Sequence, residues 1–339
     1  MKKTVLVRDV KIGGNSPVSI QSMTNTDTRD TLATVRQVEK LYQIGADIVR
    51  VSVPNDESLN TIKELSKGKV PIVADIHFDY KLAIKSVESG ADKIRINPSN
   101  IPQTAIKDIV KCCKERNIPI RVGVNKGSVK ENSITPRRLA EIALENAKII
   151  EDLGYDNLVL AVKTSDVIET IKSYRILDKL CGYPLHIGLT EAGTAKRGIL
   201  KSAVAIGSLL ADNIGDTIRV SLTGDPINEI FAAKEILRAS GLDKNFVEVV
   251  ACPTCARNNL DVEKIASTLE EMTKEINKPL RIAVMGCVVN GIGESKDADF
   301  GVAGGRDKSA IFAKGEILKT LPNDEVLDEL IRLTKEYIK

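Results

Sequence analysis

The sequence alternates, eight times over, between short runs of β-branched residues and longer segments with apolar residues at helical spacing. Such switching between period-two and helical patterns predicts a series of βα units. The predicted strands are residues 18–23, 47–53, 71–77, 92–96, 119–125, 157–162, 184–189 and 216–222. Segments such as 31–44, 136–153 and 199–210 are the predicted helices, with an eighth near 227–240. Eight units favour an α/β fold of the TIM (β/α)8 barrel type, although strand counting alone also permits an open, doubly wound sheet.

The pattern changes after Gly241. A strand at 246–251 leads to a cysteine pair; a helix at 260–276, a strand at 280–285, two short strands around 299–302 and 309–313 and a closing helix at 324–337 follow. A chain of 339 residues exceeds the size at which one hydrophobic core usually stops growing. We therefore predict a barrel domain over residues 1–240 that binds the substrate, and a small α/β domain over residues 241–339.

The composition excludes several classes of protein. No apolar run approaches the roughly 18 residues that a transmembrane helix needs, and the apolar stretch after Met1 is too short for a secretory signal. The net charge is only +3 and the basic residues are dispersed, which argues against nucleic acid binding. We expect a cytoplasmic enzyme with no membrane partner. Because cytosolic thiols stay reduced, the six cysteines indicate metal or redox chemistry rather than disulfides.

Basic residues recur near the ends of the predicted strands. Four strands carry an arginine between two β-branched residues, and one ends in lysine; these residues are Arg50, Arg95, Arg121, Arg219 and Lys163. Period-two alternation directs such side chains into the barrel, near the carboxyl ends of the strands where barrel active sites lie. Several buried cations need nearby anions. Either carboxylates such as Asp75 compensate them, or the barrel binds a polyanion, best matched by two linked phosphates.

Other polar residues end or follow the predicted strands. Asp75 and His77 share one face at the end of the third strand, and His186 lies on the seventh. For each of these, a structural hydrogen bond and a catalytic role remain equally open. Glu191 follows the seventh strand on a loop of small residues that allows close approach of a ligand, which makes it a candidate proton donor or acceptor.

Three cysteines follow strands predicted in the second domain. Cys252 and Cys255 form a Cys-Pro-Thr-Cys motif, and Cys287 begins a glycine-containing loop that also holds Glu294. A C-x-x-C pair alone suits a redox dithiol, a zinc site or an iron–sulphur cluster.

The remaining ligands of the chain favour the cluster. Structural zinc takes four nitrogen or sulphur ligands, and both histidines of the chain belong to the barrel. A cluster with three thiolates leaves one iron open to an oxygen ligand, and Glu294 is a plausible one. Cys112, Cys113 and Cys181 are interpreted as small apolar residues.

Several segments together resemble one family, the hydroxymethylbutenyl diphosphate synthases, which are iron–sulphur enzymes of the methylerythritol phosphate route to isoprenoids. The resemblance covers essentially the whole chain. It rests on Ser19-Ile20-Gln21-Ser22-Met23-Thr24, residues 49–54, 94–98 and 190–193, Cys252-Pro253-Thr254-Cys255 and residues 286–294. The chain is similar to the bacterial two-domain form, since it has no room for the central domain of plant-type members.

The resemblance implies the activity and a set of site residues. The cyclic diphosphate of methylerythritol is opened and dehydroxylated to the linear hydroxymethylbutenyl diphosphate, with electrons from reduced ferredoxin or flavodoxin. The implied 4Fe-4S cluster is held by Cys252, Cys255, Cys287 and Glu294. Glu191 matches a proposed acid, and Asn290 lies on the cluster loop within reach of substrate. The implied substrate-binding residues are Arg50, Asp75, His77, Arg95, Asn97, Arg121, Asn125, Lys163, Arg219 and Ser221.

The linker between the domains predicts how the site is assembled. The eighth helix runs back to the end of the barrel opposite the arginines, and about five linker residues reach under roughly 20 Å. We therefore expect a head-to-tail homodimer in which each cluster domain closes the partner's barrel, as the resemblance also implies. Two other functions stay open: a barrel enzyme of another class, such as a pterin-binding transferase or an aldolase with a structural cluster, and a non-enzymatic iron–sulphur carrier.

Overall fold

The computed structural model describes every residue of the chain except 1, 77–78, 130–133, 292, 294 and 339. The chain folds into two compact units, Met1–Leu242 and Asp243–Lys339. Each unit has its own hydrophobic core.

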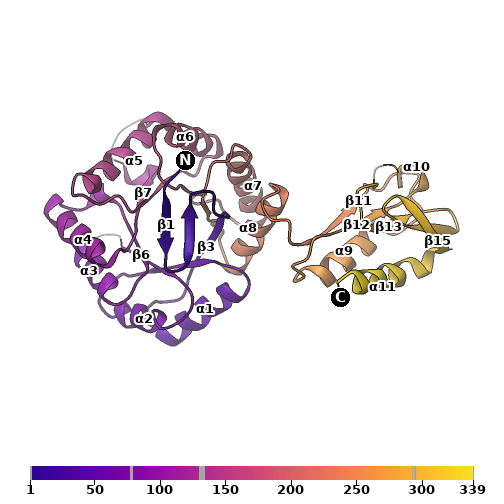
Figure 1. Ribbon diagram of the computed structural model, residues 1–339, viewed down its shortest axis with the longest axis horizontal. Coiled ribbons are helices and arrows are strands. Elements are labelled where there is room, and N and C mark those ends of the chain that lie inside the picture. The colour runs from indigo at the N-terminus through magenta and orange to yellow at the C-terminus, as the bar shows by residue number, and fades with distance from the viewer. Residues whose placement is uncertain (1, 77–78, 130–133, 292, 294, 339) are drawn as a thin grey trace. The chain divides into compact units, whose positions relative to one another are not determined.

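Within the described residues, the first unit is a barrel of eight parallel strands surrounded by helices (Figure 1). The strands pair in the order β8-β7-β6-β5-β4-β3-β10-β9, and a bridge between Leu160 and Leu185 joins the two ends of that order. The predicted barrel is confirmed, because this bridge connects the two ends of the order, which would be free edges in an open doubly wound sheet. The strands are β3 (Ser19–Met23), β4 (Ile48–Ser52), β5 (Ile72–Asp75), β6 (Lys93–Ile96), β7 (Ile120–Asn125), β8 (Leu158–Lys163), β9 (His186–Ile187) and β10 (Thr217–Ile218).

Local sequence signals fix where the barrel helices begin. The Thr135 side chain accepts a hydrogen bond from the Arg138 amide, and Pro136 occupies the first turn, where its missing amide hydrogen costs nothing. The helices are α1 (Thr31–Gln43), α2 (Ser58–Leu65), α3 (Tyr80–Glu88), α4 (Gln103–Arg116), α5 (Pro136–Glu151), α6 (Val167–Leu180), α7 (Ala195–Ala211) and α8 (Ile227–Ala239), with short 3-10 turns at η1 (Pro98–Asn100) and η2 (Lys126–Ser128).

Two strands are shorter than predicted. The expected strands 184–189 and 216–222 are reduced to β9 and β10, of two residues each. A side chain at Gly188 would place its Cβ only 2.3 Å from the carbonyl oxygen of Arg219, and the backbone there has a φ of +153°. The two segments therefore approach each other too closely after Ile187 for a regular ladder to continue.

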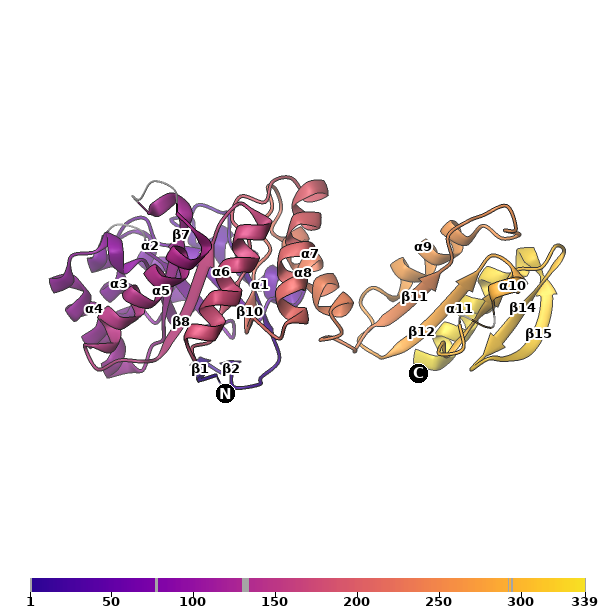
Figure 2. The same cartoon turned by 90° about the horizontal axis from the view of Figure 1, so that it is seen from above.

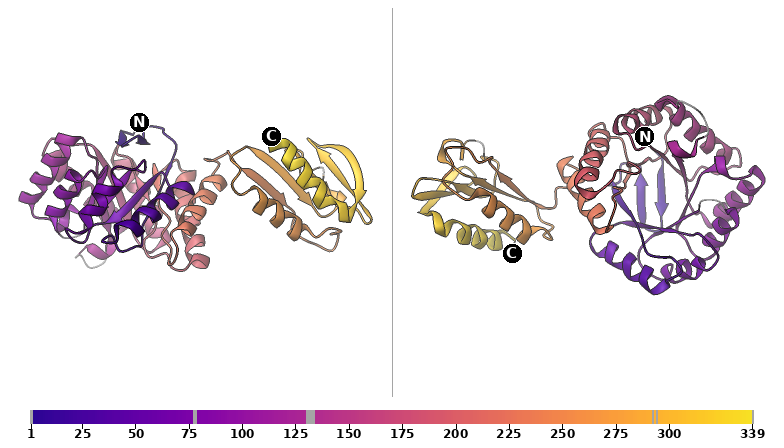
Figure 3. Two further views of the ribbon diagram at one scale, coloured as in Figure 1. Left: turned by 90° about the horizontal axis from the view of Figure 1, so that it is seen from below. Right: turned by 180° about the vertical axis from the view of Figure 1, so that it is seen from behind.

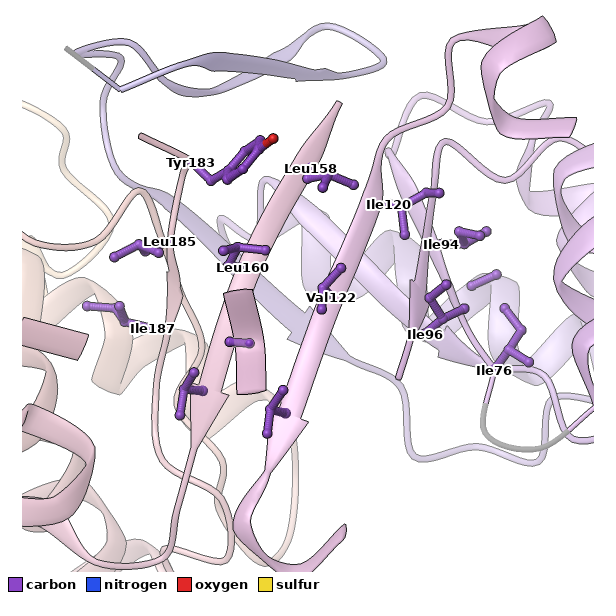
Figure 4. Packing of buried hydrophobic residues seen from close by; sticks show 14 of the residues in the cluster. Ile76, Ile94, Ile96, Ile120, Val122, Leu158, Leu160, Tyr183, Leu185 and Ile187 are labelled. Atoms are coloured by element: carbon purple, nitrogen blue, oxygen red, sulfur yellow. The ribbon is translucent and has the colours of Figure 1, made fainter. Parts of the chain in front are cut away.

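Apolar residues alternate along the strands and pack between the strands and the helices. Ile94 and Ile96 of β6, Val122 of β7, and Leu158 and Leu160 of β8 are all fully buried in this layer (Figure 4). Because successive side chains point to opposite faces of a strand, the residues between them face the barrel interior.

An N-terminal hairpin, which the sequence pattern did not predict, closes one end of the barrel (Figure 2). It consists of β1 (Thr4–Val7) and β2 (Val10–Gly13). Val7 and Ile12 are fully buried against Ile48 and Val73, which face the barrel interior near the starts of their strands. The hairpin therefore seals the amino-terminal end with apolar contacts.

The barrel interior above this seal is polar. Period-two alternation places a set of buried polar side chains there; among them are Ser19, Gln21, Arg50, Asp75, Lys93, Arg95, Arg121, Lys163, His186 and Thr217. Many barrels fill this space with branched apolar residues. Here much of the interior is filled by charged and polar side chains instead.

The second unit is an α/β domain, as predicted. Its sheet has the order β11-β12-β13-β14-β15, parallel from β11 to β13 and antiparallel beyond. The helices α9 and α11 share one apolar core with this sheet, and the orange and yellow ribbons of Figure 3 mark them. The elements are β11 (Val247–Ala251), α9 (Val262–Thr273), β12 (Leu280–Met285), α10 (Val288–Gly291), β13 (Phe300–Ala303), β14 (Lys308–Ala313), β15 (Glu316–Pro322), η3 (Asn323–Glu325) and α11 (Val326–Ile338).

Among the described residues of both units, no helix is both long enough and apolar enough to cross a lipid bilayer.

One buried hydroxyl ties a barrel helix to two strands, and its removal should destabilise the chain. Tyr174 of α6 is fully buried; its hydroxyl donates to the His186 carbonyl oxygen at 2.6 Å and accepts from the Val162 amide at 3.1 Å. Tyr174→Phe removes this partner from both backbone groups, so the free energy of unfolding should fall by about 1–3 kcal/mol. Urea unfolding followed by circular dichroism measures the change. Tyr42→Phe, at an exposed ring on α1, is the control, and equal unfolding midpoints for the two variants would contradict this account.

Candidate active site

A cavity lies among the strand ends on the carboxyl side of the barrel. Its lining combines basic and polar side chains with small residues. The lining residues are Arg50, Arg95, Arg121, Gly123, Asn125, Ala161, Lys163, Leu189, Thr190, Arg219 and Ser221. The structure thus brings together all five strand-end cations that the sequence singled out, along with Asn125 and Ser221.

Asp75 holds two of these cations. It ends β5, and its carboxylate lies 3.3 Å from Nη1 of Arg95 and 3.6 Å from Nε of Arg50. The register of the parallel strands produces the contact, because Asp75 is the partner of Ser52 on one side and of Arg95 on the other. One carboxylate therefore serves two arginines.

A second carboxylate comes from a helix. Glu229 of α8 is buried, and its carboxylate lies 3.6 Å from Nη2 of Arg219 while accepting a hydrogen bond from the Leu222 amide at 2.9 Å. Burial raises the pKa of Glu229, and nearby Arg219 opposes that effect. Burial also lowers the pKa of Arg219 to about 10.

The other two cations have no carboxylate partner in the part of the chain that the structure describes. Arg121 is 2% exposed, and its Nε and Nη1 atoms have no hydrogen-bond partner among the described residues. Burial, followed by Arg50 and Arg95, holds the pKa of Arg121 well below its usual value. Burial, followed by neighbouring Arg121, also lowers the pKa of Lys163 well below its usual value. Within the described residues, the cavity therefore has fewer carboxylates than basic side chains.

Lys163 instead contacts a buried histidine. Its Nζ atom lies 3.1 Å from Nε2 of His186, which is fully buried on β9. Burial and the Lys163 charge lower the pKa of His186 well below its usual value. The tautomer of His186 decides which nitrogen donates in this contact, which directs the lysine side chain toward β9.

A missing side chain makes room for the arginines. A Cβ atom at Gly123 would lie 3.1 Å from Nε of Arg95, closer than most carbon contacts. The glycine therefore lets the Arg95 side chain cross over β7 toward the centre of the cavity.

Among the predicted barrel residues that the structure describes, Asp75, Asn97 and Glu191 are not part of the cavity lining. Asn97 is buried just after β6 and begins the 3-10 turn η1. His77 lies outside the described residues. Glu191 is exposed, and its φ of +55° is uncommon for a residue with a side chain; it directly follows Thr190, which lines the cavity.

The sequence pattern did not indicate Lys93 or Glu229 and left His186 without a role. Lys93 could have been found, because it lies two residues before Arg95 on the same strand face. Nothing in the alternation of the strands indicated Glu229, since it reaches the cavity from a helix.

The cysteines of the second unit lie at the ends of neighbouring parallel strands. Cys252 follows β11 and Cys287 follows Gly286 after β12, and the register pairs Ala251 with Val284. The Gly286 amide donates to Sγ of Cys252 at 3.1 Å. A side chain at Gly286 would collide with Asn258, its Cβ lying 1.9 Å from the amide oxygen, so only glycine fits between the two cysteine segments.

Cys255 is exposed beside a basic residue. Backbone and side-chain hydrogen bonds from Arg257 lower the pKa of the Cys255 thiol, and the charge of Arg257 is also close to Cys287. Burial instead raises the pKa of Cys112, Cys113 and Cys181. The thiolate form, which metals require, is therefore favoured at Cys255.

The metal ligand set is incomplete in the described residues. Among them, no three His, Cys, Asp or Glu side chains are close enough together to hold a metal ion. Glu294 lies outside the described residues. Asn290 lies in α10, but its side chain lies outside the described part of the chain.

The barrel resembles solved structures of dihydropteroate synthases. It matches dihydropteroate synthase from Stenotrophomonas maltophilia with a TM-score of 0.54 and 16% identity, over 70% of this chain and 97% of that chain. The enzyme from Yersinia pestis matches with a TM-score of 0.53 and 12% identity, over 71% and 100%. At such low identity the likeness supports the barrel fold alone.

Family comparisons cover both units. Residues 2–234 match the GcpE TIM-barrel domain, and residues 248–336 match the GcpE protein C-terminal domain. Two relatives are each named 4-hydroxy-3-methylbut-2-en-1-yl diphosphate synthase (flavodoxin). That of Thermotoga maritima is 51% identical over 100% of this chain and 99% of its own, and that of Clostridium perfringens is 49% identical over 98% and 97%. The chain therefore belongs to the GcpE family of 4-hydroxy-3-methylbut-2-en-1-yl diphosphate synthases.

Proposed function

We propose that this chain converts 2-C-methyl-D-erythritol 2,4-cyclodiphosphate to (E)-4-hydroxy-3-methylbut-2-enyl diphosphate, a step of the methylerythritol phosphate route to isoprenoids. The names of the relatives state this product. The observation that carries the proposal is the excess of buried cations over carboxylates in the barrel cavity. A cyclic diphosphate supplies the negative charge that this excess requires.

The reaction balances with two electrons and one proton. The substrate dianion accepts them, the ring carbon–oxygen bond and a carbon–hydroxyl bond break, and the products are the linear diphosphate trianion and water. The ring oxygen keeps the electron pair of its broken bond. Ring opening therefore leaves one more negative charge on the phosphates.

The arginines and Lys163 bind the two phosphates. Arg121 and Lys163 lack carboxylate partners among the described residues, so no carboxylate competes for their charge-assisted hydrogen bonds to phosphate oxygens. Asp75 fixes Arg50 and Arg95 before substrate arrives, so little reorganisation is needed at the moment of reaction.

We assign the cofactor of the second unit as a 4Fe-4S cluster held by Cys252, Cys255, Cys287 and Glu294. The donor chemistry fits, since Cys252 and Cys287 follow neighbouring parallel strands, Cys255 lies three residues after Cys252, and Arg257 favours the thiolate of Cys255. When bound, the cluster supplies electrons one at a time and a Lewis-acidic iron.

The electron donor of this proposal is a reduced flavodoxin, with ferredoxin as the alternative. The names of the relatives include flavodoxin. Reduced thiols and an oxygen-sensitive cluster also suit the cytoplasm, where we place the reaction.

Two further residues complete the proposed chemistry. Glu191 donates the proton to the departing hydroxyl; the left-handed backbone at this residue, held beside the cavity residue Thr190, supports such a role. Asn290 contacts the substrate from the cluster loop.

We further propose that two chains share each site. The side chain of Lys234 on α8 lies against Gly45, which precedes β4, so α8 runs to the end of the barrel opposite the cavity. Residues 240–246 then join α8 to β11 and reach roughly 24 Å when fully extended. This length leaves little slack for a return past α8 and over the rim of the barrel. In a twofold homodimer each cluster domain closes the partner's cavity instead.

The cluster ligands make the first prediction of this proposal. Chains purified without oxygen should carry about four irons and four sulphides each. Cys252→Ala, Cys255→Ala and Cys287→Ala should each abolish this content, whereas Cys181→Ala should not, because Cys181 lies in the barrel unit. Iron and sulphide assays measure the outcome, and one zinc per chain without sulphide would refute the assignment.

Arg121 separates ligand binding from stability. Arg121→Met should lower kcat/KM, and the corresponding loss of transition-state stabilisation should be about 2–4 kcal/mol, since a charge-assisted contact to phosphate is lost. The melting temperature should not fall, because the guanidinium gains no carboxylate contact from the described residues of the free chain. Arg137→Met, at an exposed position on α5, is the matched control. Unchanged kinetics with a lowered melting temperature would mean that Arg121 is structural.

Complementation tests the shared site. Chains carrying Arg121→Met, with strongly reduced activity alone, and chains carrying Cys287→Ala, inactive alone, should regain activity when co-expressed. One hybrid site of each mixed dimer then has both an intact cluster and an intact cavity. Activity at background in verified mixed dimers would mean that each chain builds its own site.

A further inference from the structure

Lys93 is a fully buried cationic side chain that the proposed chemistry does not use. It begins β6 and faces the barrel interior beside Val73, its register partner, two residues before Arg95. It is among the largest side chains with no exposed surface in the described chain. Its Nζ atom has no hydrogen-bond partner among the described residues, and Lys93 does not line the cavity.

The charged groups around Lys93 are mostly cations. The charges of Arg121 on β7 and Arg50 on β4 lower the pKa of Lys93. The charge of Lys93 in turn lowers the pKa of His186 on β9. The nearest strand on the other side, β5, contributes Asp75, whose carboxylate is engaged with Arg50 and Arg95 one layer above.

A buried ammonium among cations is costly. Burial first, and then Arg121 and Arg50, lower the pKa of Lys93 to about 7. The charged and neutral forms of this amine therefore lie close in free energy at neutral pH, and a new negative charge nearby favours the charged form.

We propose that Lys93 is a positioning residue that matches the charge of the barrel to its ligand: its amine gains a proton from solvent when a polyanion fills the cavity and returns that proton when the cavity empties. The inference rests on the proposed function, which places a diphosphate above Lys93. No bond to Lys93 forms or breaks except its N–H bond. Ring opening adds a negative charge to the ligand, so the protonated lysine also stabilises the opened product.

The pH dependence follows from the direction of the change. Anion binding raises the pKa of Lys93 above its value of about 7 in the free chain. Below that pH the lysine is charged in both states, no proton is taken up and affinity is greatest. As pH rises through the interval between the two pKa values, binding takes up a proton and affinity falls. Above the interval the contribution of Lys93 is lost.

Sulfate binding to the full chain tests the inference, because the charge of sulfate does not change across neutral pH. Calorimetric titrations at one pH in two buffers with different heats of ionisation give the number of protons taken up. At pH 8 the chain should take up a substantial fraction of a proton, and Lys93→Met should remove at least about half of that uptake. Lys111→Met, at an exposed position on α4, should behave as the unsubstituted chain.

The affinity of the variants separates a charge role from a structural one. Lys93→Met should weaken sulfate binding about fivefold at pH 6.5, and the deficit should vanish at high pH, where the lysine is neutral in both states. Lys93→Arg should retain affinity without proton uptake, because its guanidinium stays charged. A loss of affinity in Lys93→Met that is the same at every pH, or an unchanged proton uptake, would overturn the inference.

Arg121→Met distinguishes this inference from the proposed function. Sulfate binding should fall sharply in that variant if the barrel cavity is the anion site. If the heat of sulfate binding is unchanged in Arg121→Met, the cavity is not the anion site. The proposed role of Lys93 would then be refuted as well. If Arg121→Met loses sulfate binding as expected but proton uptake is unchanged in Lys93→Met, only the proposed role of Lys93 would be refuted.

Discussion

The imbalance of charge inside the barrel is the constraint on which the rest of the structure depends. Five cations line the cavity, and within the described residues two carboxylates, Asp75 and Glu229, contact three of them. Burying a cation without a partner costs several kcal/mol, roughly as much as a small domain can spare. The free chain therefore holds this region in a state that an anionic ligand relieves. Stability and ligand affinity are therefore expected to oppose each other at these residues.

The fold tolerates this imbalance because its apolar core lies elsewhere. Ile94, Ile96, Val122 and their neighbours bury their side chains between strands and helices, where period-two alternation directs them away from the charges. The N-terminal hairpin excludes water from the closed end with Val7 and Ile12. The interior is thus free to hold a column of polar residues, with Lys93 and His186 below the cavity and the arginines around it.

Sequence alone predicted the features that follow from local patterns. Alternation of strands and helices indicated the barrel, and the same alternation directed Arg50, Arg95 and Arg121 inward. Contacts between distant segments were out of reach. Glu229 meets Arg219 only because α8 packs against the barrel, and the hairpin has partners in strands far along the chain. Two predicted strands are short where Gly188 closely approaches Arg219, and no local pattern encodes that approach.

The two units divide the demands of the proposed reaction in a way that one core could not. Neutralising a diphosphate needs fixed cations held away from water, and the barrel supplies them on strands braced by Asp75 and by the ring of helices. Delivering electrons needs a metal site that a protein reductant can approach, and the cysteines lie on strand ends and loops with Cys255 exposed. The second unit packs α9 and α11 against its own sheet, and this apolar core includes neither Cys255 nor Cys287.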